Sequence, residues 1–244
     1  MDIRKKSQIV RISNRHVTNI RTQIPVGCQP DRTIIKYRNW GIGKQLLILG
    51  NGPSLNRISV ESVKSRGLTC MGVNNIKDDF WQPEFWSVND TQKALELKKQ
   101  IGNYKGTIFS VLPKKTTLGE FIKLKNISTT QWSTDLSNGV VLGRSTVFLC
   151  LQVAFWMNFD KIFVAGIDMN PRESGNLHFY GTNTTIDPEK RKGRFINESV
   201  CYDNMIKSLS STDLEKITLC VKGINPWPFA SKLNNITPEE FNSL

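Results

Sequence analysis

Several apolar segments of this sequence end in small polar residues of the kinds that bind nucleotides. The first, LLIL, is followed at once by the stretch GNGPS at 50–54. Its two glycines allow the backbone to approach a ligand closely, and Ser54 could cap a following helix whose free N–H groups attract an anion. The amide of Asn51 could bond a ribose, a phosphate or a base. We therefore expect Gly50, Asn51, Gly52 and Ser54 to form a nucleotide-binding turn, with a plain strand-to-helix turn as the alternative.

Three more apolar segments end in Asn or Asp. GVNN ends in Asn74 and Asn75, FWSVND contains Asn89, and VAGID ends in Asp168. In parallel sheets, ligands bind outside the carboxyl ends of the strands. One such residue is ordinary turn chemistry, but the repetition predicts that these side chains and Asn51 share the rim of one pocket.

Two residues could act as a base in such a pocket. His178, in NLHFYG, titrates in the useful pH range, and Asp168 follows a predicted strand. The alternatives are a structural hydrogen-bonding histidine and an aspartate that caps the next loop. Arg144 or a basic run could neutralise a phosphate, and that run could equally be a solvated face or an acceptor-binding patch; it consists of Lys190, Arg191, Lys192 and Arg194.

Apolar periodicity from Gln45 onward predicts alternating strands and helices. Strands are expected at 45–50, 68–75, 83–90, 106–112, 160–169 and 216–223, and helices at 54–67, 91–101, 145–159 and 199–211. This order favours a Rossmann-like α/β fold, with a mostly parallel sheet and helices on both faces. The polar segment 170–198 is expected to be a lid or acceptor loop, and residues 1–44 a basic N-terminal extension of a domain that spans 45–244.

The charge of the chain favours a polyanionic partner. Its net charge is +12, from 33 Lys and Arg against 21 Asp and Glu. No apolar run approaches the length of a membrane span, and no secretion signal follows the basic N-terminus. The five cysteines form no CxxC pair, which indicates reduced thiols and favours the cytoplasm.

The motifs GNGPSL, GVNN, FWSVND and GID occur in this order within residues 45–225. Together they resemble the motifs of the small bacterial lipooligosaccharide sialyltransferases of glycosyltransferase family 42 and of related Rossmann-like glycosyltransferases. The resemblance implies an inverting, metal-independent transfer from a cytidine-nucleotide sugar, with no cofactor besides this co-substrate. It implies donor contacts at Asn51, Gly52, Ser54, Asn74, Asn89 and the turn Arg144, Ser145 and Thr146.

The catalytic residues of the resembled family match this chain only in part. In the family, a histidine after the GID strand acts as the base and tyrosines steady the departing phosphate. His178 lies in that region and Tyr180 is an available phenol. Thr182 and Asn170 stand where a close alignment would put the family's own histidine and a tyrosine.

A strongly basic chain without a membrane segment favours an acceptor in solution, and a hydroxymethylated base in DNA, as in phage DNA modification, satisfies this. The enzyme would then work in the cytoplasm, that of the host if a phage encodes it. Four tryptophans could stack a base taken out of the duplex or could instead belong to the core, namely Trp40, Trp81, Trp86 and Trp132. The alternatives are a sialyltransferase-like enzyme acting on a glycan or lipooligosaccharide, a pterin-type pyrophosphokinase that needs ATP and Mg²⁺, and a non-catalytic nucleotide-binding module. No metal site is expected, and the oligomeric state is not predicted.

Overall fold

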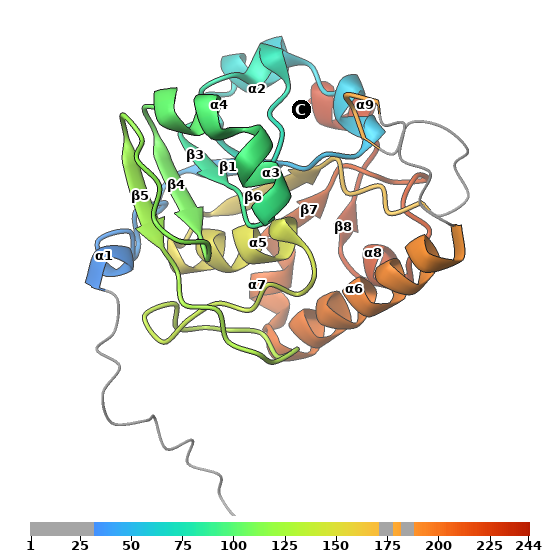
Figure 1. Cartoon of the computed structure of the whole chain (residues 1–244). Helices are drawn as coiled ribbons and strands as arrows, with labels where there is room; N and C mark the ends of the chain where they lie inside the picture. The colour runs from blue at the N-terminus through green and yellow to red at the C-terminus, as the bar shows by residue number, and fades with distance from the viewer. Residues whose placement is uncertain (1–31, 171–177, 182–187) are drawn as a thin grey trace, which may run out of the picture.

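The computed structural model describes residues 32–170, 178–181 and 188–244. They form a three-layer α/β fold around one parallel sheet, which confirms the predicted fold class (Figure 1). The strands are β1 (Gln45–Leu49), β2 (Thr69–Val73), β3 (Phe85–Ser87), β4 (Thr107–Ser110), β5 (Glu120–Lys123), β6 (Lys161–Ala165), β7 (Ile217–Leu219) and β8 (Asn234–Asn235).

The strand order across the sheet is β5-β4-β3-β2-β1-β6-β7-β8, and every pairing is parallel. The chain therefore moves outward in one direction from β1 to β5 and then returns to the other side of β1 with β6. Strands β1 and β6 flank the point where the order reverses. In open α/β sheets, this switch point is where the crevice for a ligand forms.

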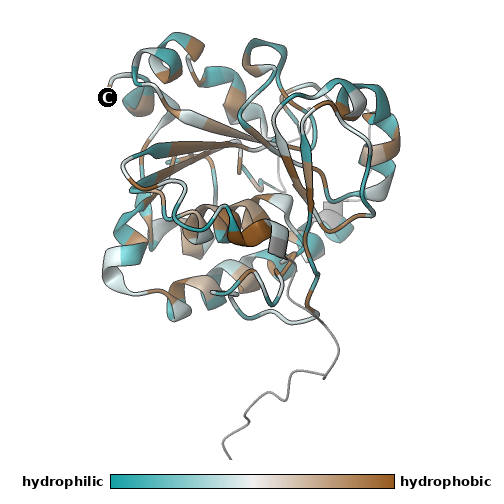
Figure 2. Ribbon diagram, turned by 90° about the vertical axis from the view of Figure 1, so that its left-hand side faces the viewer, coloured by the Kyte–Doolittle hydropathy of each residue, from teal (hydrophilic) through white to brown (hydrophobic). Residues whose placement is uncertain are grey.

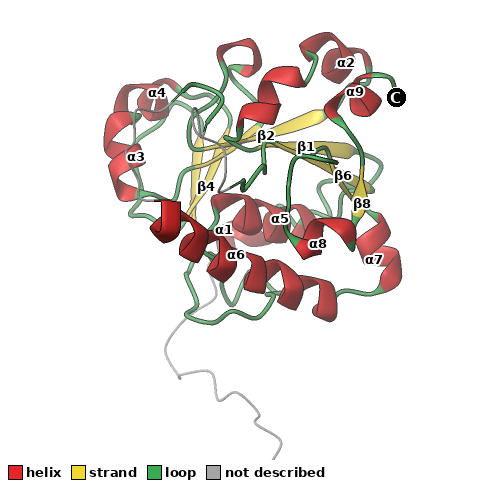
Figure 3. Ribbon diagram, turned by 90° about the vertical axis from the view of Figure 1, so that its right-hand side faces the viewer, coloured by secondary structure: helices red, strands yellow, loops and turns green. Residues whose placement is uncertain are grey.

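Helices cover both faces of the sheet (Figure 3). One face carries α5 (Thr146–Trp156), α6 (Pro188–Ser208) and α8 (Pro228–Ser231). The other carries the 3₁₀ helix η1 (Pro53–Arg57), α2 (Val60–Ser65) and α9 (Pro238–Asn242), with α3 (Thr91–Glu96) and α4 (Lys98–Asn103) beside them. The remaining short helices are α1 (Arg32–Ile35), η2 (Asp78–Phe80) and α7 (Ser211–Glu215).

The alternation of side chains along β1 shows why two helical layers are needed. Leu46 and Ile48 lie in the core cluster under α5, whereas Leu47 and Leu49 lie in the cluster under α2 and α9. A strand buried on both faces reads as a continuous apolar run. Helix α5 is also apolar along its length, because it is buried from Val147 to Ala154 and lies against β1 and β2. Figure 2 shows the apolar residues gathered in the central strands and in this helix.

Three predicted elements differ from the structure. The helix expected at 54–67 is divided into η1 and α2, because Ile58 is extended and Ser59 caps a new helix. The helix expected at 91–101 is divided at Leu97 into α3 and α4. The segment 170–198 is not a loop throughout, since α6 begins at Pro188 and runs to Ser208.

Part of the predicted N-terminal extension belongs to the folded domain. Ile34 is fully buried, and its carbonyl accepts a hydrogen bond of 2.9 Å from Nε1 of Trp156 in α5. The hydroxyl of Tyr37 lies 2.6 Å from Oε2 of Glu120. The predicted boundary between 44 and 45 therefore falls inside the domain, while residues 1–31 lie outside the described part.

The sequence predicts neither a membrane span nor a disulfide, and the described residues bear on both. Within the described residues, no helix is both long and apolar enough to cross a bilayer. The four cysteines whose thiols are described, Cys70, Cys150, Cys201 and Cys220, are buried and form no disulfide.

Candidate functional site

A pocket of about 320 Å³ opens at the carboxyl ends of the central strands. Residues that follow β1, β2, β3 and β6 form one side of it, and the start of α5, part of α6 and His178 form the other. Its polar lining residues are Asn51, Asn74, Asn89, Asp90, Arg144, Ser145, Thr146, Asp168, His178, Arg194 and Glu198. The pocket thus lies at the switch point between β1 and β6, and it brings together residues that the sequence places more than 140 positions apart.

The turn after β1 is held by Asp168, which follows β6. The backbone N–H of Ser54 donates to Oδ2 of Asp168 at 2.8 Å, and the Ser54 hydroxyl donates to Oδ1. Ser54 is therefore not the expected helix cap; η1 begins after Gly52, and no side chain caps it. Burial raises the pKa of Asp168, and the hydrogen bonds from Ser54 oppose that shift.

The two glycines of the turn make room for β6 rather than for a ligand alone. A Cβ on Gly50 would overlap the carbonyl of Gly166, and a Cβ on Gly52 would overlap the carboxylate of Asp168. Gly166 itself has φ of 70°, a conformation that favours glycine. Gly50 does not line the pocket, whereas Gly52 does.

Three of the four asparagines predicted at the rim, Asn51, Asn74 and Asn89, line the pocket, and two of these three also hold the framework. Nδ2 of Asn51 donates to the carbonyls of Val73 and Asn75, at 2.8 Å each. Nδ2 of Asn89 donates to Oγ of Ser87, and its Oδ1 accepts from the N–H of Val111.

Asn74 differs from the other two asparagines. It has φ of 50°, and its Oδ1 is buried without a hydrogen-bond partner in the described part of the chain. A buried acceptor of this kind calls for a donor from a ligand or a water molecule. Its neighbour Asn75 lies outside this pocket and lines a second one.

The turn at Arg144 gives the pocket a positive side. Arg144 has φ of 59° and an exposed side chain, and Ser145 is the N-cap of α5 without a side-chain capping bond. The first turn of a helix leaves backbone N–H groups free to bind an anion. Arg194 from α6 lines the same pocket, and neither arginine belongs to an ion pair within the described residues.

The sequence prediction missed Glu198, which lines the pocket from α6 and is 6% exposed. Burial raises its pKa to about 7, against the opposing effects of a hydrogen bond from Ser145 and the charge of Arg194. A signal for it exists in the sequence. Phe195, Glu198, Tyr202 and Met205 recur at helical spacing, so the carboxylate falls on the core-facing stripe of α6.

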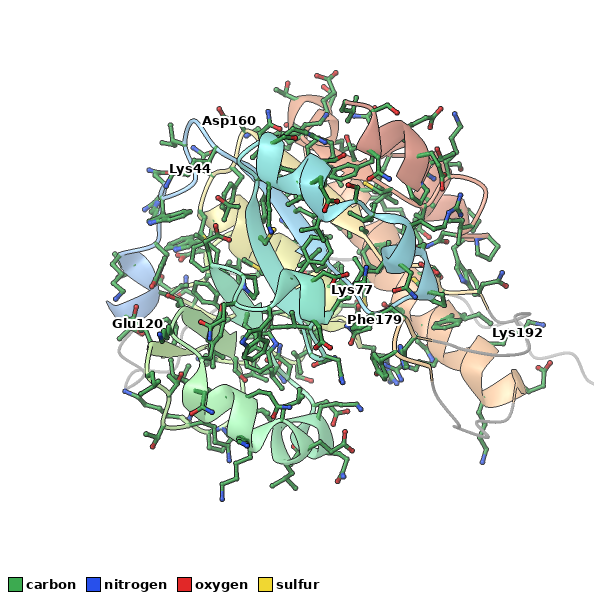
Figure 4. The ribbon with its side chains drawn as sticks, turned by 90° about the horizontal axis from the view of Figure 1, so that it is seen from above. Lys44, Lys77, Glu120, Asp160, Phe179 and Lys192 are labelled. Carbon is green, nitrogen blue, oxygen red and sulfur yellow. The ribbon has the colours of Figure 1, made fainter. Side chains whose placement is uncertain are left out.

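The predicted acceptor patch is divided by α6. Arg194 turns to the pocket, whereas Lys190 and Lys192 are exposed and do not line it. Figure 4 shows Lys192 at the outer end of this helix. The side chain of Arg191 lies outside the described residues.

His178 and Tyr180 stack on each other but line different pockets. The N–H of Phe179 donates to the carbonyl of Asn51 at 2.9 Å, which fixes this short segment against the turn after β1. His178 lines the pocket, while Tyr180 lines the second pocket. Their rings stack with centroids 5.0 Å apart and 13° between planes. Tyr180 therefore does not join the other predicted residues in the first pocket.

Other predicted features have structural roles. Trp86 is fully buried and donates to the carbonyl of Asn74 at 2.7 Å, and Trp132 packs on Phe148 and Phe155. Within the described part of the chain, no cluster of three or more His, Cys, Asp or Glu side chains could hold a metal ion.

Comparisons of the chain with protein-family models, with curated proteins and with solved structures give no match.

Proposed function

We propose that this protein is a glycosyltransferase that moves a sugar from a nucleotide-activated donor to a hydroxyl acceptor. The observation that carries the proposal is the composition of the pocket at the switch point. Arg144, Arg194 and the N-terminus of α5 form a positive side, and His178, Asp168 and Glu198 bring three titratable groups to the same pocket. The arginines and the helix N-terminus suit a phosphate, and the titratable groups supply candidates for a base that accepts a proton.

The positive side supports binding of the donor phosphate. A leaving nucleotide phosphate develops negative charge in the transition state, and fixed donors aimed at it lower the barrier. Two arginines and a helix N-terminus supply such donors without a metal ion. The unpartnered Oδ1 of Asn74 would accept a hydrogen bond from the ribose or the base. Metal independence is part of the proposal.

The chemistry requires one base and one leaving group. The acceptor hydroxyl loses its proton to the base, and its oxygen forms a bond to the anomeric carbon of the sugar. The bond from that carbon to the donor phosphate oxygen breaks, and the electron pair leaves with the phosphate. Attack from the opposite side inverts the anomeric centre. A positioned base contributes about 10²- to 10⁴-fold to such a step.

His178 is our first candidate for the base, because a neutral imidazole can accept the proton near neutral pH. Glu198 is the second, since its raised pKa of about 7 makes its carboxylate a stronger base than an ordinary one. Both oxygens of Asp168 already accept hydrogen bonds from Ser54, which favours a positioning role for this residue.

We further propose a hydroxymethylated base in DNA as the acceptor, and the cytoplasm as the place of reaction. The net charge of +12 supports a polyanionic partner. A glycan acceptor, as in the sialyltransferase-like alternative, is the second candidate. It is favoured by the motifs that resemble family 42 rather than by the charge.

The pocket at the switch point is called the donor pocket below. A panel of nucleotides and nucleotide sugars tests it by thermal unfolding. A ligand at 100 times its Kd stabilises the fold by about 2.7 kcal/mol. We expect one nucleotide class to raise Tm in the presence of EDTA, and Arg144→Ala to remove most of this rise. Arg38→Ala is the matched control, because Arg38 stacks on Trp156 outside the pocket. If no nucleotide or nucleotide sugar raises Tm, the proposed function is wrong; if binding requires Mg²⁺ and ATP, the pyrophosphokinase alternative is favoured.

A further inference from the structure

A second pocket of about 700 Å³ lies behind the segment 178–180. The same two short segments, 74–75 and 178–180, separate it from the donor pocket. Asn74 faces the donor pocket and Asn75 the second, and His178 faces the donor pocket while Phe179 and Tyr180 face the second. The two pockets are therefore neighbours, since residues adjacent in the chain line one pocket or the other.

The walls of the second pocket are aromatic. Trp81 is 40% exposed and packs edge-on with the buried Trp86, with ring centroids 6.0 Å apart. Tyr180 lines the other wall, and Nζ of Lys93 lies 5.5 Å from the centre of its ring. Large apolar rings left open to solvent inside a cavity offer stacking surfaces for a flat ligand.

The polar groups of this pocket include an unpartnered hydrogen-bond acceptor and two carboxylates. Oδ1 of Asn75 is buried without a partner among the described residues. Asp78 and Asp79 also line the pocket, and Lys77 forms an ion pair of 3.0 Å with Asp79. Figure 4 shows Lys77 and Phe179 close together at this place. Acceptors and carboxylates repel a phosphate, so the pocket suits a neutral ring that carries N–H or O–H donors.

Two exposed lysines lie beside the pocket on the helix that contributes Gln100 to its lining. Lys98 and Lys99 are exposed on α4 directly before Gln100, which lines the pocket. An aromatic pocket with lysines beside it suits a nucleic acid, whose base can enter while its phosphates contact the lysines. Enzymes that modify a base take it out of the stack and hold it between aromatic side chains.

We propose that the second pocket binds the acceptor base of a single-stranded or unpaired DNA segment, stacked on Trp81, with its donor groups on Asn75. This inference rests on the proposed glycosyl transfer for its reaction, since it places the acceptor next to the sugar donor. His178, the first candidate for the base, stacks on Tyr180, which lines this second pocket.

The test is a fluorescence-anisotropy titration of the full chain. The probe is a labelled single strand of about 12 nucleotides with one 5-hydroxymethylcytosine, within the usual site size for such binding. Trp81→Ala should weaken binding by at least about fivefold, the lower end of base–aromatic stacking. Trp40→Ala is the matched control and should change it by less than about twofold, because Trp40 is similarly exposed but lies beside Lys44 at the amino end of β1, where that lysine covers its ring.

A second substitution tests the same pocket in case Trp81→Ala prevents folding. Gln100→Ala removes an exposed amide and should weaken binding by about threefold or more. Unchanged binding by both variants overturns the proposal, and so does a change in tryptophan fluorescence that is lost in Trp81→Ala and is caused by soluble oligosaccharides but not by the oligonucleotide. If no nucleotide sugar binds while the oligonucleotide still depends on Trp81, the proposed function fails and the base pocket stands.

Discussion

Glu198 and Asp168 are two buried carboxyls in one pocket, and their surroundings differ. Asp168 accepts two hydrogen bonds from Ser54, which hold it in one place. Glu198 exchanges its proton near pH 7, because burial in α6 penalises its charged form. Carboxyls in contrasting environments often take different roles in one site. We expect Asp168 to fix the turn after β1 and Glu198 to respond to pH.

Glu198 should make the stability of the fold depend on pH. Its pKa in the folded chain, about 7, lies above the ordinary 4.5. Between these values the folded chain keeps a proton that the unfolded chain has lost. The stabilisation is therefore complete below pH 4.5 and is lost as the pH rises through 7. From the size of the shift, the loss is about 3 kcal/mol at most.

The substitution Glu198→Gln removes this titration and keeps the shape. We expect the free energy of unfolding of the variant, relative to the natural chain, to rise from pH 5 to pH 7.5 and then level off. Urea unfolding at several pH values measures it. Glu215→Gln is the control, because Glu215 is exposed on α7. A difference between Glu198→Gln and the natural chain that stays constant with pH would contradict the prediction.

At the scale of elements, the contact between β1 and β6 decides the shape of the donor pocket. The N–H of Gly50 donates to the carbonyl of Ala165 at 2.8 Å, and the N–H of Gly52 donates to the carbonyl of Gly166 at 2.8 Å. These bonds continue the pairing of the two strands beyond their ends. The pocket therefore depends on backbone atoms that a side chain would displace.

Gly50→Ala should destabilise the fold by about 1–3 kcal/mol, because its Cβ meets backbone atoms that cannot rotate away. The midpoint of urea unfolding measures this loss. Gly102→Ala in α4 is the matched control, since nothing lies within 4 Å of its Cβ. This control should stabilise the chain by about 0.5–1 kcal/mol, as alanine favours a helix over glycine. Equal effects of the two substitutions would contradict the close approach of β1 and β6.

Helix α6 should separate two kinds of binding. Arg194 lines the donor pocket, whereas Lys192 is exposed outside it. Arg194→Ala should weaken nucleotide-sugar binding by about tenfold, the loss of one charge-assisted hydrogen bond. Lys192→Ala should leave that binding within about twofold and lower the affinity for DNA instead. Calorimetric titration with each ligand measures both. An equal response of the donor to the two variants would count against the pocket assigned here.

At the scale of the whole molecule, the sheet was predictable where it is most buried. Strands β1, β2 and β6 come from continuous apolar runs, since both of their faces are covered. The short outer strands β5 and β8 were not predicted, because EFIK and NN carry little apolar pattern. The sequence pattern predicts a loop at the start of α6, because charged residues dominate its first turns and its apolar stripe begins only at Phe195.

The meeting of Asn51, Asn74, Asn89 and Asp168 at one pocket followed from the rule for parallel sheets, and the structure places all four there. Their hydrogen-bond partners did not follow from it. Asn51 bonds to one carbonyl at the end of β2 and one just beyond it, contacts set by the spacing of strands rather than by local sequence. Tyr180 lies two residues after His178 but faces another pocket, which a one-dimensional pattern does not distinguish.

The excess of positive charge should appear as a steep dependence of DNA binding on salt. Each phosphate that a lysine or arginine neutralises releases counterions, so six contacts give a slope of about −5 in log K against log salt. Affinity would then fall by roughly 10³-fold between 50 and 200 mM salt. Nucleotide-sugar binding in the same buffers is the control, because a small ligand displaces few counterions. DNA affinity that stays constant over this range would remove DNA as the acceptor and favour a neutral glycan. That result would leave the proposal for the donor pocket standing, because the test of the donor pocket uses nucleotides and nucleotide sugars rather than DNA.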